Sequence, residues 1–147
     1  MTGAAASTRS WNLVALPRFV DDRGALTVVE TGRQVDFRIA RVYYLYGVPP
    51  RTVRGGHVHH TLHQLLVATS GALDAVVDDG WRRETIRLDD PSRGLYIGPM
   101  VWRELAGFTA DAVCLVLASA GHDASDYSYD YERFRRYITQ GAGGPEQ

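Results

Sequence analysis

Short apolar runs separated by turn residues constrain the fold of this chain more than any other feature. Val, Leu, Ile and Tyr gather in these runs, and pairs of Gly, Pro and Asp stand between them. This pattern is typical of an all-β sandwich or barrel. The expected strands are Trp11–Pro17, Ala25–Glu30, Arg38–Tyr46, Gly56–His60, His63–Thr69, Ala72–Asp78, Trp81–Leu88, Arg93–Ile97, Val101–Leu105 and Ala112–Ala118.

Turn and helix signals complete the expected layout. Asp78-Asp79-Gly80 predicts a hairpin turn between two strands, with the glycine at a positive φ. A sustained 3.6-residue apolar period occurs only after Ala124. Ser125-Asp126-Tyr127 is expected to cap a short helix there, which would end near Tyr137-Ile138. The residues at helical spacing are Tyr127, Tyr131, Phe134 and Ile138.

The length of 147 residues predicts a single domain. We place it at residues 11–138, between a disordered N-terminal tail (1–10) and a disordered C-terminal tail (139–147). The net charge of −1 provides no basic excess for a nucleic-acid or membrane surface. No apolar stretch approaches the ~20 residues of a membrane span, and the N-terminus lacks a basic region followed by an apolar stretch. We therefore expect a cytoplasmic protein.

Four of the five histidines lie in one short window that begins at Arg54 and ends at Gln64. His57 and His59 are two residues apart, so on a strand their side chains share a face. Imidazole titrates near neutral pH, and two histidines on one face are costly to bury without polar partners. The window therefore predicts a polar cavity that performs acid–base chemistry. Lysine chemistry is excluded, because all 16 basic residues are arginine.

The pattern H-x-H-x4-Q-x6-G, which runs from His57 through Gln64 to Gly71, resembles the first cupin motif. The usual third group in that motif is a glutamate that completes a metal site, and Gln64 replaces it with an uncharged amide. Arg103 lies near the second motif, where metal-binding members place their last ligand. Its guanidinium stays protonated and cannot bind a metal. These two departures predict a site without metal or other cofactor.

Further segments extend the resemblance from about residue 20 to about residue 138. The chain resembles the cupin-type sugar-nucleotide 3,4-ketoisomerases, which act on dTDP-4-oxo-6-deoxyglucose. The resemblance implies an all-β cupin jelly-roll barrel with a short C-terminal helix. The matching segments are Asp22-Arg23-Gly24-Ala25-Leu26, Arg41-Val42-Tyr43-Tyr44, Arg54-Gly55-Gly56-His57-Val58-His59, Asp78-Asp79-Gly80, Gly94-Leu95-Tyr96-Ile97-Gly98-Pro99, Val101-Trp102, Val116-Leu117-Ala118-Ser119, Ser125-Asp126-Tyr127 and Tyr129-Asp130-Tyr131.

The implied reaction moves the keto group from C4 to C3 through an enediol and gives dTDP-3-oxo-6-deoxyglucose for deoxyamino-sugar biosynthesis. A histidine removes the C3 proton, which the neighbouring carbonyl acidifies, and nothing is oxidised overall. His57 and His59 are the expected acid–base pair, and the sequence leaves open which is the base and which the acid. The family often has a histidine where this chain has Arg103, and the branch with arginine tends toward the gluco product.

Tyr43 is the third expected catalytic residue. Tyr43, Tyr44 and Tyr46 lie on one predicted strand, so Tyr43 must face away from the other two. The resemblance, and not this alternation, selects Tyr43 as the tyrosine that faces the pocket.

Four further residues are expected to bind substrate. Arg54 would supply a cation for the enediolate oxygen or for phosphate. Arg23 would bind the diphosphate through two parallel hydrogen bonds, unless it only forms an ion pair within the Asp21–Gly24 turn. Gln64 and Arg103 complete the set.

The expected partners are a dTDP-linked 4-keto-6-deoxy sugar and a second copy of the chain. Single-domain jelly rolls have exposed sheet edges, which a homodimer can cover. The resemblance implies exchange of the N-terminal strand, which would let Arg23 reach a partner's pocket. Three alternatives remain open: a 3,5-epimerase on the same substrate class, a metal-dependent cupin such as a dioxygenase, and a non-catalytic sugar-nucleotide-binding cupin.

Overall fold

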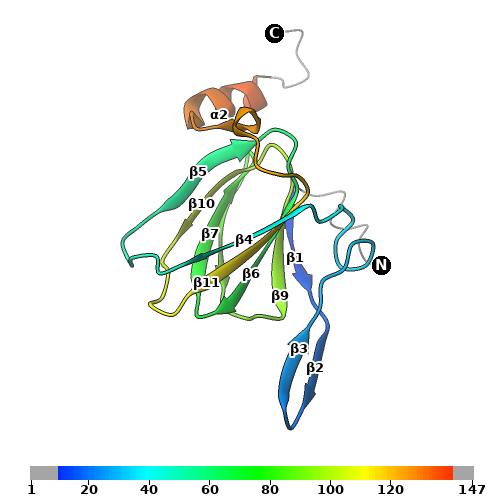
Figure 1. The fold of residues 1–147 in the computed structure, drawn as a ribbon. Helices are drawn as coiled ribbons and strands as arrows, with labels where there is room; N and C mark the ends of the chain where they lie inside the picture. The colour runs from blue at the N-terminus through cyan, green and yellow to red at the C-terminus, as the bar shows by residue number, and fades with distance from the viewer. Residues whose placement is uncertain (1–9, 141–147) are drawn as a thin grey trace.

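Two five-stranded antiparallel sheets packed face to face form the body of the protein (Figure 1). The computed structural model describes residues 10–140. The first sheet has the order β1 (Trp11–Ala15), β9 (Arg93–Ile97), β6 (Gln64–Ser70), β11 (Val113–Ala118), β4 (Arg41–Tyr46). The second has the order β12 (Tyr127–Ser128), β5 (Arg54–His59), β10 (Trp102–Ala106), β7 (Leu73–Asp78), β8 (Arg83–Leu88). The predicted all-β jelly roll is confirmed, as a sandwich of two separately hydrogen-bonded sheets rather than a closed barrel.

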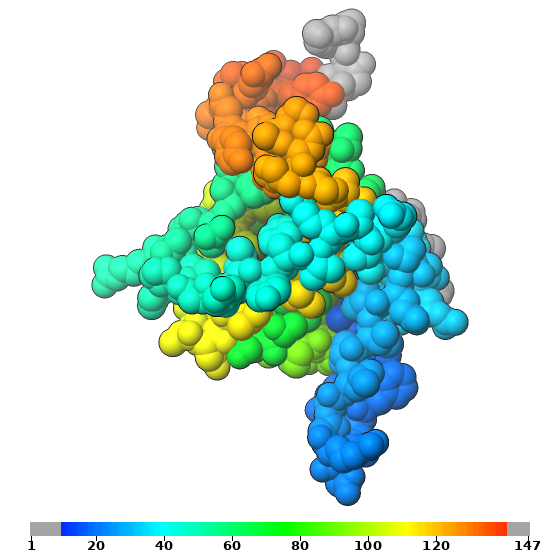
Figure 2. Space-filling view, viewed as in Figure 1, coloured from blue at the N-terminus to red at the C-terminus, as the bar shows by residue number. Residues whose placement is uncertain are grey.

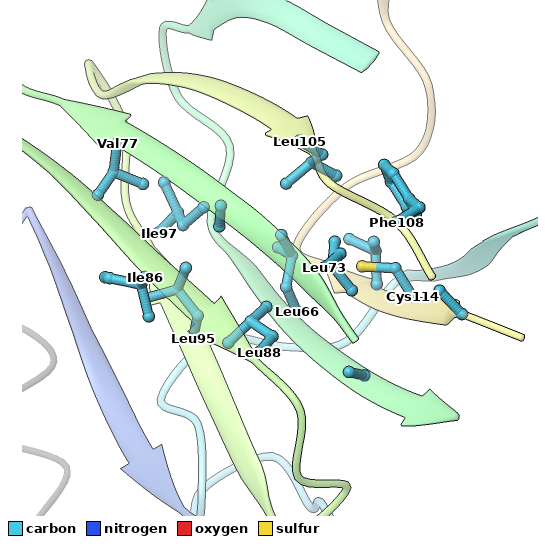
Figure 3. Packing of buried hydrophobic residues seen from close by; sticks show 14 of the residues in the cluster. Leu66, Leu73, Val77, Ile86, Leu88, Leu95, Ile97, Leu105, Phe108 and Cys114 are labelled. Carbon is cyan, nitrogen blue, oxygen red and sulfur yellow. The ribbon is translucent and has the colours of Figure 1, made fainter. Parts of the chain in front are cut away.

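The main hydrophobic core lies between the two sheets (Figure 3). Alternate residues of each strand point into it, as the two-residue period of a strand requires. Leu66 of β6 meets Leu73 and Val77 of β7 in this core, and Cys114 of β11 is buried beside them. Each such large aliphatic side chain contributes about 1.5–3 kcal/mol on burial, so this layer holds the two sheets together.

A second apolar cluster covers the outer face of the first sheet. Leu65 and Val67 of β6 alternate with the inward-facing residues and pack against Val35 and Phe37, which lie between β3 and β4. Both faces of β6 are therefore buried. This explains why the sequence of β6 is a continuous apolar run and does not alternate with polar residues.

A hairpin projects from the body of the sandwich (Figures 1 and 2). It consists of β2 (Arg18–Asp21) and β3 (Gly24–Thr27), and all of its residues are exposed. The turn and the second strand agree with the prediction from the sequence, whereas β2 was not predicted. The predicted Asp78–Gly80 turn is confirmed: the Gly80 backbone N–H donates to Asp78 Oδ1 over 2.7 Å, and φ of Gly80 is 96°.

The C-terminal segment differs from its prediction at the start of the helix. A single 3₁₀ turn, η1 (Ala124–Asp126), leads into β12, and the helix α2 covers only Tyr131–Thr139. The helix cap is Asp130, whose side chain accepts from the Arg133 backbone N–H over 3.0 Å. The predicted cap at Ser125-Asp126-Tyr127 was wrong, because Tyr127 instead pairs with β5 and the Asp126 side chain binds residues on that side of the sheet.

The ends of the described chain lie close to the predicted domain bounds. The Ser10 carbonyl accepts from the Gly98 N–H over 2.8 Å, and Thr139 is the last residue of α2. Ser10 and Thr139 each lie one residue outside the predicted domain bounds. The rest of both predicted tails, residues 1–9 and 141–147, lies outside the described residues. No helix within residues 10–140 is long and apolar enough to cross a membrane.

Candidate active site

A cavity of about 430 Å³ opens between the two sheets, beside the edge strand β4. One wall comes from the first sheet and the other from the second, because the strands that line it lie in facing layers. The main lining residues are Arg41 and Tyr43 on β4, Gln64 on β6, Arg54 and His57 on β5, and Arg103 on β10. Tyr127 and Tyr129, whose rings are stacked with centroids 5.9 Å apart, add an aromatic wall from the C-terminal segment.

The histidine pair lies on β5, as its two-residue spacing predicts. The Nε2 atoms of His57 and His59 are 3.1 Å apart, and the two rings are nearly perpendicular. His57 lines the cavity, whereas His59 is only 1% exposed and does not line it. The two histidines therefore occupy different positions, one facing the cavity and the other behind it.

Two glycines bend β5 just before His57. Gly55 and Gly56 have φ values of 88° and 71°, and the pairing of β5 with β10 shifts register next to Arg103. A side chain at Gly55 would bring its Cβ within 3.0 Å of the Arg103 carbonyl oxygen. The glycine pair thus permits a bulge that brings β5 close to β10, so that His57 and Arg103 are opposite each other in the ladder.

Asp126 lies behind the histidine pair and was not among the predicted site residues. Its Oδ2 is 3.3 Å from Nδ1 of His59. Its Oδ1 accepts from the backbone N–H of Thr61 over 2.9 Å and from the Thr61 hydroxyl over 2.8 Å. The carboxylate thus connects the C-terminal segment to the end of β5. The signal that could have identified Asp126 is its place in Ser125-Asp126-Tyr127, a segment that matches the family. The same segment also resembles a helix cap, and this was the prediction.

A hydrogen-bonded chain starting at Arg103 crosses the floor of the cavity. Arg103 is only 3% exposed, and its Nη1 donates to Gln64 Oε1 over 2.6 Å. The amide of Gln64 in turn donates from Nε2 to the Tyr43 hydroxyl oxygen over 3.0 Å. Because the hydroxyl of Tyr43 accepts this bond, its own hydrogen remains available for the cavity.

The guanidinium of Arg103 is held by backbone carbonyls as well as by Gln64. Its Nη2 donates to the carbonyl of Val101 over 2.8 Å and to that of Gly98 over 3.3 Å. Met100 lies between these residues with φ of 60°, a left-handed conformation that is rare outside glycine. No ion pair to Arg103 is found among the described residues, so it is a buried cation bound by neutral groups.

Burial and the charge of Arg103 set the protonation states of the site. Burial, followed by the nearby Arg103 charge, lowers the pKa of His57 to about 4, while the Gly55 carbonyl acts in the opposite direction. The same two causes lower the pKa of His59, against the attraction of Asp126. Burial raises the pKa of Tyr43. At neutral pH the cavity therefore holds an unprotonated imidazole and a protonated phenol.

The structure brings most of the predicted site residues together. Tyr43, Arg54, His57, Gln64 and Arg103 line the cavity, with His59 directly behind.

Arg23 does not lie in this cavity. It is in the turn of the β2–β3 hairpin, where its side chain is 85% exposed and Nη2 contacts Asp21 Oδ2 over 2.6 Å. Within one copy of the chain, this is the turn ion pair that the sequence left open as the alternative.

Four charged or aromatic side chains that line the cavity were not predicted: Arg41, His122, Tyr127 and Tyr129. Arg41 stacks over the Tyr43 ring at 5.1 Å. His122 is the one histidine outside the Arg54–Gln64 window, and nothing in its local sequence indicates that it lies near the others. Tyr127 and Tyr129 are in segments that match the family but were assigned to a helix.

The donor set of the cavity does not fit a metal ion. No group of three or more His, Cys, Asp or Glu side chains within residues 10–140 is arranged to hold one. The third polar group beside the histidines is the amide of Gln64, and the guanidinium of Arg103 contacts it. A second, divalent cation next to a buried guanidinium would be strongly repelled in this environment.

Comparison with known proteins places this geometry in a family. The family model described as FdtA, WxcM-like, C-terminal matches residues 9–139. The chain belongs to this family. A curated relative from Aneurinibacillus thermoaerophilus, TDP-4-oxo-6-deoxy-alpha-D-glucose-3,4-oxoisomerase, is 38% identical over 128 residues, which cover 87% of this chain and 92% of the relative. The predicted resemblance is thereby confirmed.

Two solved structures share the fold closely. One is a histidine-to-asparagine variant of the 3,4-ketoisomerase QdtA from Thermoanaerobacterium thermosaccharolyticum in complex with TDP-4-keto-6-deoxyglucose, with a TM-score of 0.86, 36% identity and coverage of 90% of this chain and 96% of that one. The other is the WlaRB TDP-quinovose 3,4-ketoisomerase from Campylobacter jejuni, with a TM-score of 0.84, 40% identity and coverage of 87% and 98%.

The depressed pKa of His57 predicts a loss of stability in acid. Between its value of about 4 in the folded protein and the ordinary 6.5, the unfolded chain binds a proton that the folded chain does not. This contribution is complete above about pH 6.5 and is lost as the pH falls toward 4. Thermal unfolding between about pH 7 and pH 4 should therefore show a smaller drop in Tm for His57→Asn than for the native sequence. Equal drops would contradict the assignment.

Removal of metal ions should leave turnover unchanged, because Gln64 and Arg103 stand where metal-binding cupins place ligands. The measurement is turnover of dTDP-4-oxo-6-deoxyglucose before and after dialysis against a strong chelator. A loss that one divalent metal restores would show that the interpretation of these two residues is wrong.

Proposed function

We propose that this protein isomerises dTDP-4-oxo-6-deoxyglucose to dTDP-3-oxo-6-deoxyglucose by proton transfer. The observation that carries the proposal is the pairing, across one cavity, of the neutral imidazole of His57 with the buried cation of Arg103 and the protonated hydroxyl of Tyr43. The relatives named for 3,4-ketoisomerase activity support it. The product would feed deoxyamino-sugar biosynthesis.

His57 is the base in this mechanism. It removes the proton from C3, and the electron pair of the broken C–H bond moves to the C4 carbonyl, which becomes an enediolate oxygen. A neutral imidazole is required for this step, and burial beside Arg103 maintains that state at neutral pH. The cations of Arg103 and Arg54, both on the cavity wall, stabilise the negative charge as it develops.

Collapse of the enediolate completes the isomerisation. The O3 proton moves to O4, C3 becomes the carbonyl, and C4 takes a proton from the Tyr43 hydroxyl. The proton that His57 took from C3 then returns to the Tyr43 oxygen through solvent. Atoms and electrons balance without an oxidant. Tyr43 is the donor to C4, because its raised pKa keeps the hydroxyl protonated and Gln64 leaves its hydrogen free.

The positions of base and donor bear on the stereochemistry at C4. His57 belongs to β5 in one sheet and Tyr43 to β4 in the facing sheet, so they approach the sugar from opposite walls of the cavity. In the substrate the C3 hydrogen is axial on the lower face. Delivery to C4 from the opposite face gives the gluco product, whereas return to the same face gives the galacto product. The 40% identity to a TDP-quinovose ketoisomerase also favours gluco, since quinovose is 6-deoxyglucose.

Replacement of the base should abolish most of the activity. His57→Asn is expected to lower kcat by about 10²-fold or more, the usual scale for a lost general base. His60→Asn is the matched control, since His60 is exposed and does not line the cavity. The assay couples the product to a 3-aminotransferase. A near-normal kcat in His57→Asn would overturn the assignment of His57 as the base. A native protein that binds dTDP-4-oxo-6-deoxyglucose but does not convert it would favour the non-catalytic sugar-nucleotide-binding cupin.

Deuterium incorporation separates the isomerase from the epimerase and tests Tyr43. In D₂O the native protein should exchange the C3 hydrogen of the substrate for deuterium. It should also place deuterium at C4 of the product and none at C5. Deuterium at C5 would favour a 3,5-epimerase. Tyr43→Phe should still exchange the C3 hydrogen while product formation falls at least about 10-fold.

The proton NMR spectrum of the native product, recorded in H₂O buffer, should show a large diaxial H4–H5 coupling. A small coupling would mean that the galacto product forms.

A homodimer with exchanged N-terminal hairpins forms part of this proposal. An isolated two-stranded hairpin is marginal in water, yet β2–β3 projects alone with Phe19, Val20 and Leu26 about 60% exposed (62%, 59% and 61%). The edge strand β4 has an exposed face of its own, with Tyr44 59% and Tyr46 69% exposed. A hairpin from a second copy alongside β4 would cover both surfaces.

Dimerisation would also give Arg23 a function. The other face of β4 carries Tyr43 and Arg41 into the cavity, so a partner's hairpin beside β4 brings its turn near the cavity mouth. Sedimentation at micromolar concentration should show a dimer. Phe19→Asp should shift it toward monomer, while Arg23→Ala should keep the dimer and raise KM. A native monomer would contradict the proposal.

A further inference from the structure

The two oxygens of the Asp126 carboxylate make different contacts. Oδ1 accepts from the backbone N–H and the hydroxyl of Thr61, at 2.9 and 2.8 Å. Oδ2 faces Nδ1 of His59 at 3.3 Å, and the His59 side chain is only 1% exposed. The first set of contacts anchors the C-terminal segment to the end of β5. Among the described residues, the imidazole of His59 is the one hydrogen-bond partner of Oδ2, so this contact acts on the histidine pair.

A carboxylate oxygen can only accept a hydrogen bond, so Nδ1 of His59 must carry the hydrogen. In a neutral imidazole the other nitrogen then has the lone pair, and Nε2 of His59 becomes an acceptor. That atom is 3.1 Å from Nε2 of His57, which must therefore carry its hydrogen and donate it. The lone pair of His57 is left on Nδ1, and the Gly55 carbonyl, which raises the pKa of His57, favours the state in which this imidazole has taken a proton. One carboxylate thus determines the tautomers of two imidazoles in series.

We propose that Asp126 is a positioning residue that acts through His59 to hold His57 in the tautomer whose Nδ1 is free to accept the substrate proton. The inference rests on the proposed function in that it takes His57 as the base. It goes beyond that function by assigning His59 and Asp126 a defined task, in which neither of them touches the substrate.

The charges of Arg103 and Asp126 act in opposite directions on the protonation of His57. Arg103 lines the cavity together with His57, whereas Asp126 contacts His59. When His57 takes a proton it becomes positive, and the repulsion from Arg103 opposes this. Its Nε2–H then donates more strongly to His59, which in turn donates to the carboxylate. Through these two hydrogen bonds, Asp126 stabilises the positive charge on protonated His57, which Arg103 destabilises.

Replacement of Asp126 by asparagine should invert the tautomers of both histidines without changing the size of the side chain. The Thr61 backbone N–H needs an acceptor, so the amide oxygen of Asp126→Asn must take the Oδ1 position and its NH₂ group must face His59. The NH₂ group donates to Nδ1 of His59. Nε2 of His59 then carries the hydrogen and donates to Nε2 of His57, which leaves the hydrogen of His57 on Nδ1 and blocks the base.

The experiment compares Asp126→Asn with Thr61→Val and Asp126→Glu. Thr61→Val removes a hydroxyl contact to Oδ1 but leaves Oδ2 and the histidines untouched. Ring nitrogen chemical shifts from ¹H–¹⁵N NMR of the ligand-free protein report the tautomers, and steady-state kinetics on dTDP-4-oxo-6-deoxyglucose report the rate. Thermal unfolding checks that each variant is folded.

Asp126→Asn should show the inverted tautomers, with kcat lowered about 10²-fold or more and KM changed by less than about 3-fold; an orienting carboxylate can contribute up to about 10⁴-fold to kcat. Thr61→Val should keep the native tautomers and most of the activity, and Asp126→Glu should recover part of the lost rate. Native tautomers in Asp126→Asn, or an equal loss of kcat in Thr61→Val, would overturn the proposal. Because the NMR measurement needs no substrate, a failure of the proposed function would appear separately, as an inactive native protein with the tautomers described here.

Discussion

The buried guanidinium of Arg103 is the interaction on which the site depends. A buried charge costs several kcal/mol unless its hydrogen-bonding groups are satisfied. Arg103 meets this requirement with two backbone carbonyls and the side chain of Gln64, and no carboxylate among the described residues neutralises it. Its positive charge therefore extends into the cavity. It helps keep His57 unprotonated, and it favours any intermediate in which negative charge develops on an adjacent oxygen. In the proposed mechanism the same residue therefore keeps the base His57 unprotonated and stabilises the enediolate that forms when His57 removes the proton.

The sandwich architecture distributes this chemistry over two walls. Strand alternation sends Tyr43 inward from β4 while Tyr44 and Tyr46 face outward, and the bulge at Gly55 and Gly56 sets His57 on β5 facing the same cavity. Because the two strands belong to different sheets, a substrate bound between them as proposed would meet the base on one face and the hydroxyl donor on the other. The hydrogen bond from Gln64 ties the donor to Arg103 and hence to the wall that carries the base. Relative placement of the two groups is therefore a property of the packed core and not of a mobile loop.

Local patterns in the sequence predicted what depends on local geometry. The two-residue period of a strand is enough to place His57 and His59 on one face, and β9 (Arg93–Ile97) has its predicted bounds. Contacts between distant segments were not predictable in this way. Asp126 reaches His59 across 67 residues, and its local sequence matches a helix cap equally well. Strand β2 was missed because its residues are all exposed, so no half-buried alternation marks it. The proposed contact of Arg23 with a partner's cavity would require a second chain, and no pattern within one chain tests it.

The departure from the metal-binding cupin pattern has a physical interpretation in this structure. A metal ion in such a site supplies positive charge and an exchangeable coordination position. The pair of Gln64 and Arg103 supplies the charge alone, because a guanidinium held by carbonyl and amide oxygens donates hydrogen bonds but accepts no ligand. A site of this kind can stabilise an enediolate oxygen but cannot activate a bound water or oxygen molecule. In the proposed mechanism the chemistry at the cavity consists of moving protons between His57, the sugar and Tyr43, which is the only chemistry that a 3,4-keto shift requires.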